Sequence, residues 1–496
     1  MSRTIMIQGT MSNVGKSLLT AALCRIFRQD GYCVAPFKSQ NMALNSFVTE
    51  DGLEIGRAQA MQAEAAGIVP RVWMNPILLK PTTDVGSQVI VNGEVVGNYT
   101  AKEYFEYKKQ LVSVIQNAFS RLEEQADIIV IEGAGSPAEI NLKDHDIVNM
   151  GLAQLLQAPV LLAGDIDRGG VFAQLYGTMA LLEAEERRHV KGLILNKFRG
   201  DLSILEPGLR RLEELCGVPV TGVVPYLRLD IDEEDSLSRR LEEKPKQGLL
   251  DIAVIRLPHL SNYTDFSPLE RTDAVSLRYV NREKELGEPD LLILPGTKST
   301  MADLLWMRQN GLEASVKKLA EKDVPILGIC GGYQMLGETL EDPENTEGGG
   351  SLRGMELLPV RTVFSLSKTR QQTKGKTLAL PLPFGEITPL PVEGYEIHCG
   401  RSETSGKPFL QKADGSFDGC RNGSVCGTYL HGLFDEGQFA DALVQSLLQK
   451  KGIALTTEPV CGKEYKEQQY DLLAQAVREH IDMEQVYTIL EKGMAK

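Results

Sequence analysis

The sequence predicts an α/β protein made of two doubly wound domains. Short apolar runs bounded by Gly, Pro or Asp alternate with segments of helical period, and this series occurs twice along the 496 residues. Such alternation is typical of a mostly parallel sheet covered by helices on both faces, and a chain of this length exceeds one hydrophobic core. Between the two series, a charged stretch without apolar period indicates a linker. We expect a first domain over 1–230, a linker over 231–250, a second domain over 251–445 and a helical tail over 446–496.

The charge, the cysteine spacing and the apolar runs disfavour several classes of partner and location. A formal charge of −14 repels a phosphate backbone, so we expect no nucleic-acid partner. The eight cysteines include no CxxC pair, which favours reduced thiols in the cytoplasm. We find neither a signal-peptide pattern at the N-terminus nor an apolar run of membrane-spanning length, so we expect no membrane partner. The sequence carries no signal for an oligomeric state.

Five apolar runs of the first domain have the length of buried strands. They lie at 4–7, 128–131, 160–163, 192–195 and 220–224. Segments of helical period lie between them, notably at 17–27 and 104–123.

The strongest motif of the first domain is a glycine-rich loop between a strand and a helix. The segment GTMSNVGKS occupies 9–17, directly after the first predicted strand. The standard phosphate loop has Gly six residues before its Lys, whereas here Thr10 takes that position and the Gly stands one residue earlier. Gly15 permits close backbone approach, Lys16 neutralises anionic oxygens and Ser17 supplies a hydroxyl for Mg²⁺. We therefore predict a phosphate site, with a capped helix start as the alternative.

Acidic side chains at strand ends are candidates for binding a Mg²⁺–nucleotide complex. Glu132 directly follows an apolar strand and precedes a Gly-Ala-Gly segment. Asp51 lies in an Asp-Gly pair, and a turn without a binding role is an equally weighted alternative for it. Asp165 and Asp167 also follow a strand, and we expect one of them to act at the site while the other caps the turn or pairs with Arg168.

The second domain repeats the strand–helix pattern. Its predicted strands lie at 252–257, 291–294, 324–329 and within 423–430, and its clearest helices lie at 300–310 and 312–322. Two polar interruptions, EDPENTEGGGS at 341–351 and SKTRQQTKGK at 367–376, predict surface loops.

A cysteine in a strand–turn–helix context is the best nucleophile candidate. Cys330 lies in VPILGICGGYQ at 324–334, where the nearby glycines suit a strained elbow. The start of the following helix favours a thiolate, while a buried small residue is the alternative. Backbone N–H groups at Gly331 and at Gly296, after another strand, are the expected donors to an oxyanion.

Thiolate chemistry needs a base, and two histidines compete for that role. His431 follows the apolar segment GTYL and precedes GLF. His398 lies in the segment GYEIHCG. We favour His431, and either residue has the alternative of a hydrogen-bonded core histidine.

These two segments resemble known enzymes. GICGGYQ at 328–334 is similar to the nucleophile elbow of the triad-type glutamine amidotransferases, and YLHGLF at 429–434 to their histidine segment. The resemblance implies a class I glutamine amidotransferase-like fold and makes Gln334 a candidate for substrate binding. The common class has Glu two residues after this His, whereas Leu433 stands here, as in the cobyrinate-amidating branch. An orienting carboxylate would then come from elsewhere or be absent, and Glu396 is one candidate.

The N-terminal half resembles dethiobiotin synthetase, which activates a carboxylate or carbamate with ATP. The resemblance rests on the GT and VGKS parts of the phosphate loop. It implies phosphate-binding and Mg²⁺-binding positions at Lys16, Ser17, Lys38, Asp51 and Glu132. It also places the purine-recognition segment at Asn196 and Lys197.

Four further segments, at 35–42, 54–60, 75–81 and 133–142, resemble the cobyric acid synthase family, and the resemblance covers essentially the whole chain. It implies that ATP and glutamine serve to amidate the b, d, e and g carboxylates of adenosylcobyrinic acid a,c-diamide. We take Asp146, Asp165 and Gln334 as candidates for substrate binding; a salt-bridged loop is the equal alternative for Asp146.

Three rival functions remain at this stage. The first is a cobyrinic acid a,c-diamide synthase, which shares both domains. The second is a partition-type nucleotide switch, which the lack of an early Lys in the phosphate loop disfavours. The third is a binding module without catalysis, against which the intact elbow, base and phosphate loop argue.

Overall fold

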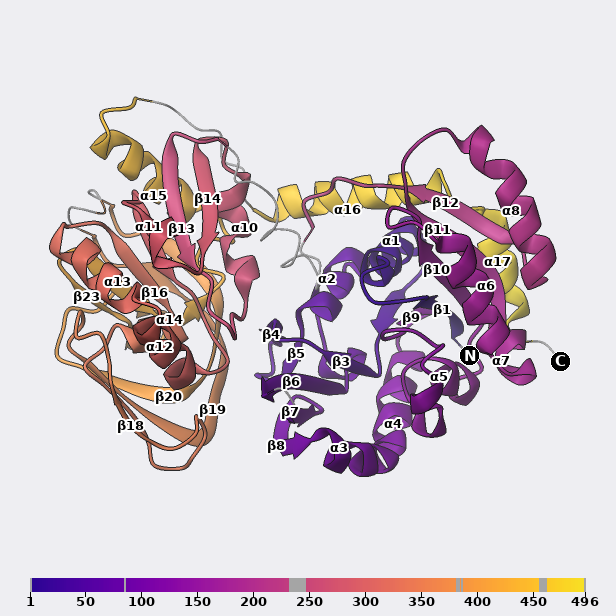
Figure 1. The fold of residues 1–496 in the computed structure, drawn as a ribbon, viewed down its shortest axis with the longest axis horizontal. Helices are drawn as coiled ribbons and strands as arrows, with labels where there is room; N and C mark the ends of the chain where they lie inside the picture. Colours follow the sequence, from indigo (N-terminus) through magenta and orange to yellow (C-terminus); the bar gives the residue numbers. More distant parts are fainter. Residues whose placement is uncertain are drawn as a thin grey trace. The chain divides into compact units, whose positions relative to one another are not determined.

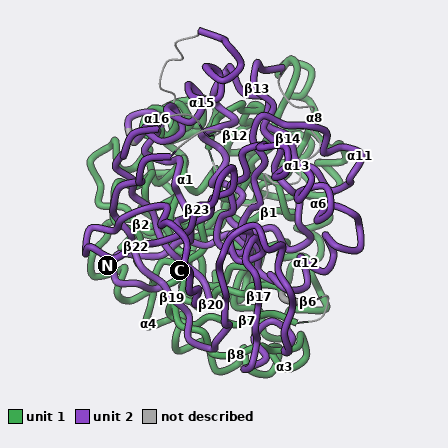
Figure 2. The backbone as a smooth tube through the Cα atoms, turned by 90° about the vertical axis from the view of Figure 1, so that its left-hand side faces the viewer, with its two compact units in different colours: residues 1–43, 54–235, 466–496 green, residues 44–53, 236–465 purple. Residues whose placement is uncertain are grey.

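The computed structural model describes residues 2–83, 86–231, 247–380, 384, 387–454 and 462–494. Backbone contacts divide the chain into two compact units (Figure 2). Unit 1 consists of Met1–Ala43, Glu54–Asp235 and Lys466–Lys496, and unit 2 of Leu44–Leu53 and Ser236–Tyr465. Most of the predicted linker over 231–250 lies outside the described residues. Among the described residues, we find no helix with the length and apolar character needed to cross a membrane.

The core of unit 1 is a six-stranded sheet in the order β12-β11-β10-β1-β9-β2. Every neighbouring pair runs parallel, which confirms the predicted mostly parallel sheet. Apolar runs form these strands because helices cover both faces and leave little room for polar side chains. The strands are β1 (Arg3–Gly9), β2 (Val34–Phe37), β9 (Ile128–Glu132), β10 (Val160–Asp165), β11 (Val190–Phe198) and β12 (Val220–Pro225).

The helices of unit 1 surround this sheet (Figure 1). The predicted helix over 104–123 is interrupted, because a 3₁₀ turn, η2 (Lys108–Leu111), separates two α-helices. Up to α8, the helices are α1 (Lys16–Gln29), α2 (Arg57–Ala66), η1 (Val72–Met74), α3 (Ala101–Tyr107), α4 (Val112–Glu123), η3 (Ile140–His145), α5 (Met150–Leu155), α6 (Val171–Leu181), α7 (Ala184–His189) and α8 (Leu202–Cys216). A smaller sheet in the order β3-β6-β7-β8 contains β3 (Gln40–Met42), β6 (Ile77–Thr83), β7 (Gly86–Val91) and β8 (Glu94–Thr100).

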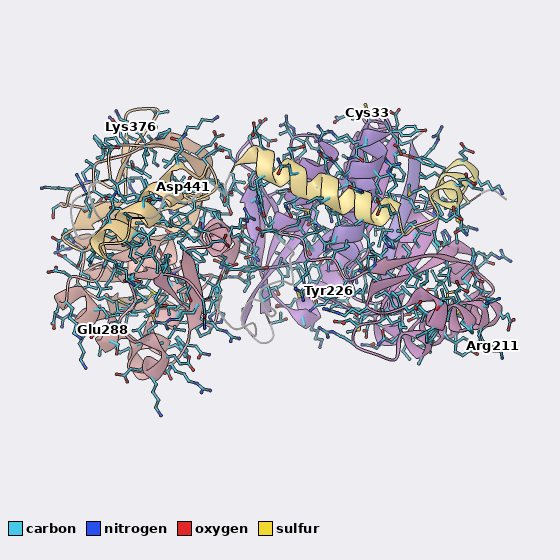
Figure 3. The ribbon with its side chains drawn as sticks, turned by 90° about the horizontal axis from the view of Figure 1, so that it is seen from above. Cys33, Arg211, Tyr226, Glu288, Lys376 and Asp441 are labelled. Carbon is cyan, nitrogen blue, oxygen red and sulfur yellow. The ribbon has the colours of Figure 1, made fainter. Side chains whose placement is uncertain are left out.

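The last two helices of the chain, α16 (Lys463–Arg478) and α17 (Met483–Lys492), return to unit 1. Their apolar faces share one core cluster with β1 and α1, and Figures 1 and 3 show α16, in yellow, along the elements of unit 1. Arg25 of α1, almost fully buried, pairs with Glu467 and Asp471 of α16 at 2.6 and 2.7 Å. The tail predicted to follow the second domain therefore completes the core of the first.

Between β3 and β5 the chain leaves unit 1 for ten residues. Leu44–Leu53 belongs to unit 2 and contains β4 (Ser46–Val48). The chain re-enters unit 1 at β5 (Glu54–Gly56), which leads directly into α2.

Unit 2 is built on a six-stranded sheet in the order β14-β13-β15-β16-β24-β23. Only β23 runs antiparallel to its neighbour among these described strands, so the predicted second α/β domain is confirmed. The strands are β13 (Leu250–Ile255), β14 (Val275–Val280), β15 (Leu291–Leu294), β16 (Ile326–Ile329), β23 (Cys420–Asn422) and β24 (Val425–Thr428). Its helices are η4 (Tyr263–Phe266), α10 (Ser267–Arg271), α11 (Glu283–Leu286), α12 (Thr300–Gln309), α13 (Leu312–Glu321), α14 (Gly331–Met335) and α15 (Gln438–Lys450).

A second, mixed sheet in unit 2 corrects one prediction. The basic segment 367–376, predicted as a surface loop, lies inside β19 (Val360–Thr377), which pairs antiparallel with β20 (Pro391–Thr404). The apolar alternation of a strand is missing there because this half of β19 is largely exposed, and Lys376 points outward in Figure 3. The other predicted loop, 341–351, overlaps two paired strands. The remaining strands are β17 (Thr339–Asp342), β18 (Gly350–Arg353), β21 (Leu410–Lys412), β22 (Phe417–Asp418) and β25 (Leu430–His431).

Candidate active sites

The phosphate loop of unit 1 connects β1 to α1. Gly15, at the N-cap of α1, has a φ of 94°, a left-handed conformation that favours glycine. A Cβ atom at this position would lie 2.3 Å from Nδ2 of Asn196. That amide in turn donates to the backbone oxygen of Val14 at 2.7 Å, so the predicted purine-segment residue braces the loop itself. Both backbone freedom and lack of a side chain are therefore required at Gly15.

Lys16 is the first residue of α1 and is 8% exposed. Its Nζ donates to the backbone oxygens of Met11 at 3.0 Å and Gly135 at 3.2 Å. These contacts hold the ammonium at the start of α1, against the phosphate loop. The geometry thus suits the predicted role in phosphate binding.

Glu132, at the end of β9, lies at the centre of a polar network. Its Oε1 accepts from Ser17 Oγ at 2.8 Å and Lys38 Nζ at 2.9 Å, and its Oε2 accepts from Gln62 Nε2 at 2.5 Å. Burial alone would raise the pKa of Glu132, but the charge of Lys38 and these hydrogen bonds lower it below its usual value. The carboxylate is therefore held ionised beside the phosphate loop.

These residues open onto a cavity of about 400 Å³. Asp146 lines the cavity, yet its carboxylate accepts from the backbone N–H groups of Val148, Asn149 and Gly151 at 2.8–2.9 Å. Asp146 thus caps the turn into α5, a structural role different from the salt-bridged loop considered above. Other lining residues are Ser12, Asn13, Gly15, Lys16, Ser17, Lys38, Gln40, Asn41, Met42, Lys108, Glu132, Gly135, Ser136, Glu139, Lys143 and Asn149.

The two acids after β10 have structural partners. Asp165, almost fully buried, pairs with Lys197 at 2.8 Å and accepts from the backbone N–H of Asp167 at 2.9 Å. Asp167 pairs with Arg199 at 2.9 Å, whereas Arg168 lies 3.9 Å from Asp165. Both acids therefore support the loop, and a substrate contact from Asp165 stays a prediction.

The residues present fit a Mg²⁺ ion. Mg²⁺ in nucleotide sites takes one or two protein oxygens together with phosphates and water. Ser17 and Glu132 supply two adjacent oxygens at the cavity, while the described residues contain no larger cluster of His, Cys, Asp and Glu suited to a metal. Asp51, the third predicted ligand, belongs to unit 2 and is exposed, and its role stays a prediction.

The nucleophile candidate of unit 2 lies at a sharp elbow. Cys330 connects β16 to α14 and has a φ of 52°, in the left-handed region that costs a non-glycine residue strain. The residue is 7% exposed, and its thiol lies 3.6 Å from the backbone oxygen of Ile397. Strained backbone held by the core on both sides is typical of a nucleophile elbow.

His431 forms the centre of a buried triad. Its Nδ1 lies 2.7 Å from Oδ2 of Asp265, and Cys330 is near enough to act on its charge. Burial would lower the pKa of His431, but the charge and hydrogen bond of Asp265, together with the nearby Cys330 side chain, raise it to about 10. The imidazole is therefore held as an imidazolium beside Cys330, in position to pass a proton during attack by the sulfur.

Asp265 was not found from the sequence. It lies in η4, 166 residues before His431, and its Oδ1 also accepts from the backbone N–H of Gly432 at 3.0 Å. No motif at the histidine points to it. The only signal is a polar side chain shortly after the first strand of the second domain, at the strand end where sites form in such sheets.

Glu396, the candidate for the orienting carboxylate, has other partners. It pairs with Lys412 at 2.7 Å and accepts from Thr373 at 2.8 Å. His398, the competing base, is directed to the backbone oxygen of Gly400 at 2.6 Å and stacks on Tyr429. The geometry therefore favours His431 over His398, and the interpretation of Glu396 as the orienting group was wrong.

The loop after β15 lies against both the nucleophile and the base. A Cβ atom at Gly296 would be 3.0 Å from Cε1 of His431, and one at Gly331 would be 3.2 Å from the backbone nitrogen of Thr297. The two predicted oxyanion-hole segments are thus neighbours of the reacting groups. Thr297 hydrogen-bonds to Asp303, which holds this loop in place.

Both ends of the Gln334 amide form a hydrogen bond within unit 2. Its Oε1 accepts from Thr300 at 3.1 Å and its Nε2 donates to the hydroxyl of Tyr429 at 3.1 Å. The side chain is almost fully buried, so it forms part of the wall behind Cys330. Contact with a substrate stays a prediction.

Two family models match the chain. A CobQ/CobB/MinD/ParA nucleotide binding domain matches residues 5–236, and a CobB/CobQ-like glutamine amidotransferase domain matches residues 251–439. The expected nucleotide-binding and glutamine amidotransferase domains are thereby confirmed.

Relatives match the chain from end to end. It is 57% identical to a cobyric acid synthase of Lachnoclostridium phytofermentans, over 100% of both chains. It is 56% identical to one of Ruminiclostridium cellulolyticum, over 100% of this chain and 98% of that one. It is 50% identical to one of Yersinia enterocolitica, over 99% of both. The resemblance recognised in the four N-terminal segments is confirmed, and the chain belongs to the cobyric acid synthase family.

Proposed function

We propose that this enzyme converts adenosylcobyrinic acid a,c-diamide to adenosylcobyric acid by amidating its b, d, e and g carboxylates, with ATP and glutamine as co-substrates. The triad Cys330–His431–Asp265, in a chain that also holds a phosphate loop, is the observation that carries this proposal. The full-length cobyric acid synthase relatives support the choice of acceptor.

The first half-reaction activates the acceptor in unit 1. The carboxylate oxygen of the corrinoid side chain attacks the γ-phosphorus of ATP, and ADP leaves with the electrons of the broken bond. Lys16 neutralises negative charge on the phosphate oxygens. Catalysis of phosphoryl transfer depends mainly on such neutralisation and on the positioning of the reactants. When Mg²⁺ is bound, it supplies further neutralisation of the phosphates, and Ser17 and Glu132 would hold it.

The second half-reaction releases ammonia in unit 2. The Cys330 thiolate attacks the side-chain amide carbon of glutamine, and backbone N–H groups at Gly331 and in the Gly296 loop stabilise the oxyanion. His431 donates its proton to the leaving ammonia, and a thioester forms. The neutral imidazole then takes a proton from water, which attacks the thioester and frees glutamate. Ammonia displaces phosphate from the acyl phosphate, which gives the amide.

The remaining site roles rest on the sequence, and for Asp146 also on its place in the cavity lining. Asn196 and Lys197 bind the purine, Asp51 is a candidate Mg²⁺ ligand by resemblance, and Asp146, Asp165 and Gln334 contact the substrates. The cytoplasm is the proposed place of action, in line with the spacing of the cysteines in the sequence.

The test is a count of amidations by mass spectrometry. Purified enzyme with ATP, Mg²⁺ and glutamine is incubated separately with the a,c-diamide and with cobyrinic acid. We expect four added amides on the diamide. Two amides on cobyrinic acid, with none on the diamide, would instead identify an a,c-diamide synthase. Absence of ATP-dependent amidation on both would contradict the proposal.

A further inference from the structure

The segment Leu44–Leu53, which we name the strap, is coded within the nucleotide-binding half but belongs to unit 2. We propose that the strap positions His431 and Asp265, and thereby makes glutamine hydrolysis responsive to occupancy of the phosphate cavity. The inference rests on the proposed function of the two sites.

The first contact of the strap holds a tyrosine against the catalytic histidine. Tyr395 of β20 stacks on His431 with ring centroids 5.4 Å apart and planes 21° apart. The Tyr395 hydroxyl donates to the backbone oxygen of Ser46 at 3.0 Å, and Phe47 packs edge-on against the same ring at 5.3 Å. The side chain that flanks the imidazole is thus fixed at its far end by the strap.

The second contact holds the segment that carries Asp265. The backbone N–H of Ser46 donates to Oδ1 of Asn262 at 3.1 Å. Asn262 has a φ of 52° and opens η4, where its own backbone oxygen accepts from the N–H of Asp265 at 3.0 Å. One strap residue, Ser46, therefore binds the supports of both His431 and Asp265 through its two backbone groups.

The third contact reaches the strand beside the nucleophile. Val48 is fully buried in a cluster with Tyr395 and Ile397, and its backbone oxygen accepts from Gln372. The backbone oxygen of Ile397 is the group that lies 3.6 Å from the Cys330 thiol. All three members of the triad thus have a neighbour in contact with the strap.

Both ends of the strap are connected through the backbone to elements that contribute residues to the phosphate site. Upstream, β3 contributes Gln40, Asn41 and Met42 to the cavity lining, and only Ala43 separates it from the strap. Downstream, β5 leads into α2, whose Gln62 binds Glu132 at 2.5 Å. A ligand that shifts β3 or Glu132 therefore acts on the two ends of a ten-residue segment that supports the triad. Coupling between two sites requires a structural element with two arrangements, and ligands at both sites must change the balance between these arrangements.

The test uses two variants that remove one strap contact each. Tyr395→Phe keeps the ring stack on His431 but loses the donor to Ser46, and Asn262→Gly keeps the left-handed backbone but loses the acceptor. Tyr470→Phe removes a tyrosine hydroxyl bond of similar length, to Glu64 at 2.8 Å in unit 1, and serves as the matched control. Glutamine hydrolysis is measured with and without Mg·ATP and the a,c-diamide, and amidation is measured with ammonium chloride.

We expect wild-type hydrolysis to rise when Mg·ATP and acceptor are added. In both strap variants the rise should shrink about three- to tenfold through kcat, as for the loss of one hydrogen bond, with KM for glutamine within about twofold. Ammonia-supported amidation should match wild type, and Tyr470→Phe should behave as wild type throughout.

Three results would overturn the inference: a wild-type enzyme whose hydrolysis ignores the ligands, strap variants with a full response, or variants that lose ammonia-supported amidation equally. A further variant, Cys330→Ala, tests the proposed function independently of the strap. Glutamine hydrolysis that survives in Cys330→Ala would contradict the triad whatever the strap variants do.

Discussion

The two sites differ in how their charged groups are prepared for reaction. In the phosphate site, Lys16 donates to two backbone oxygens, and Glu132 accepts from the ammonium of Lys38 and the amide of Gln62. The cavity beside them, of about 400 Å³, admits a large ligand. In the amidotransferase site, Cys330, His431 and Asp265 are buried, and His431 is held by Asp265 at 2.7 Å. The first site is built to neutralise a ligand's charge, and the second to move a proton within a fixed group. Variants should therefore separate the two functions.

Replacement of the nucleophile should give the largest effect. Cys330→Ala should reduce glutamine-supported amidation by roughly 10³-fold or more, because no thiolate remains to form the thioester. Ammonia-supported amidation should stay within about twofold. Cys33→Ala, at an exposed cysteine, is the control and should leave both unchanged. Loss of both activities in folded Cys330→Ala would show that the sites are not separable.

Removal of the phosphate-loop ammonium should give the converse pattern. Lys16→Met should lower amidation with either nitrogen source by about 10²- to 10³-fold, as for other lost electrostatic contacts to a transition state. Glutamine hydrolysis measured without ATP should persist. Lys109→Met, at an exposed Lys paired with Glu106, supplies the control. Normal amidation in Lys16→Met would refute the phosphate-loop interpretation.

Neutralising the orienting carboxylate should weaken hydrolysis and shift its pH dependence. Asp265→Asn should lower kcat for glutamine by about 10²-fold, since the imidazolium loses its partner. Asp265, together with Cys330, raises the pKa of His431 to about 10, and the imidazolium that donates its proton to the leaving ammonia exists only below that pKa. The alkaline limb of the wild-type profile should therefore lie near pH 10 and move to lower pH in the variant. An unmoved limb would mean that Asp265 does not control the histidine.

The smallest catalytic effect is expected at Glu396. Burial would raise the pKa of Glu396, but His398, 3.8 Å away, and the paired ammonium of Lys412 lower that pKa to about 2. The carboxylate therefore stabilises the fold at pH values above its usual pKa of 4.5, and that contribution is lost as the pH falls toward 2. Glu396→Gln should cost about 2 kcal/mol in the free energy of unfolding at neutral pH, measured by denaturant titration. Glutamine hydrolysis should stay within about twofold; a 100-fold loss would restore Glu396 as the orienting group.

The same contrast explains what the sequence could reveal. Gly15, Lys16 and Ser17 are adjacent, so one motif predicted their loop, and Cys330 lies in a similarly local elbow. Asp265 comes to His431 from 166 residues away, and the pairing depends on strand order rather than on any neighbour in the sequence. The parallel strands were predictable because burial on both faces demands apolar runs.

Other elements were missed for related reasons. The half of β19 over 367–376 is polar and exposed, so backbone pairing with β20 forms it without an apolar pattern. The amphipathic pattern of α16 predicts a helix with a buried face, but it does not specify which core receives that face.

Because α16 and α17 return to unit 1, the two units complete their cores in a particular order during translation. Unit 2 has all of its residues once Tyr465 has left the ribosome, whereas unit 1 still lacks the side chains of α17 that share a core with β1. The domain whose coding begins first is therefore the last to close its core, against the usual N-terminal-first order. Cutting the gene between 231 and 250 would give a nucleotide-binding fragment with an open apolar face, so a separable version of this domain needs residues 463–494 fused or supplied alongside it.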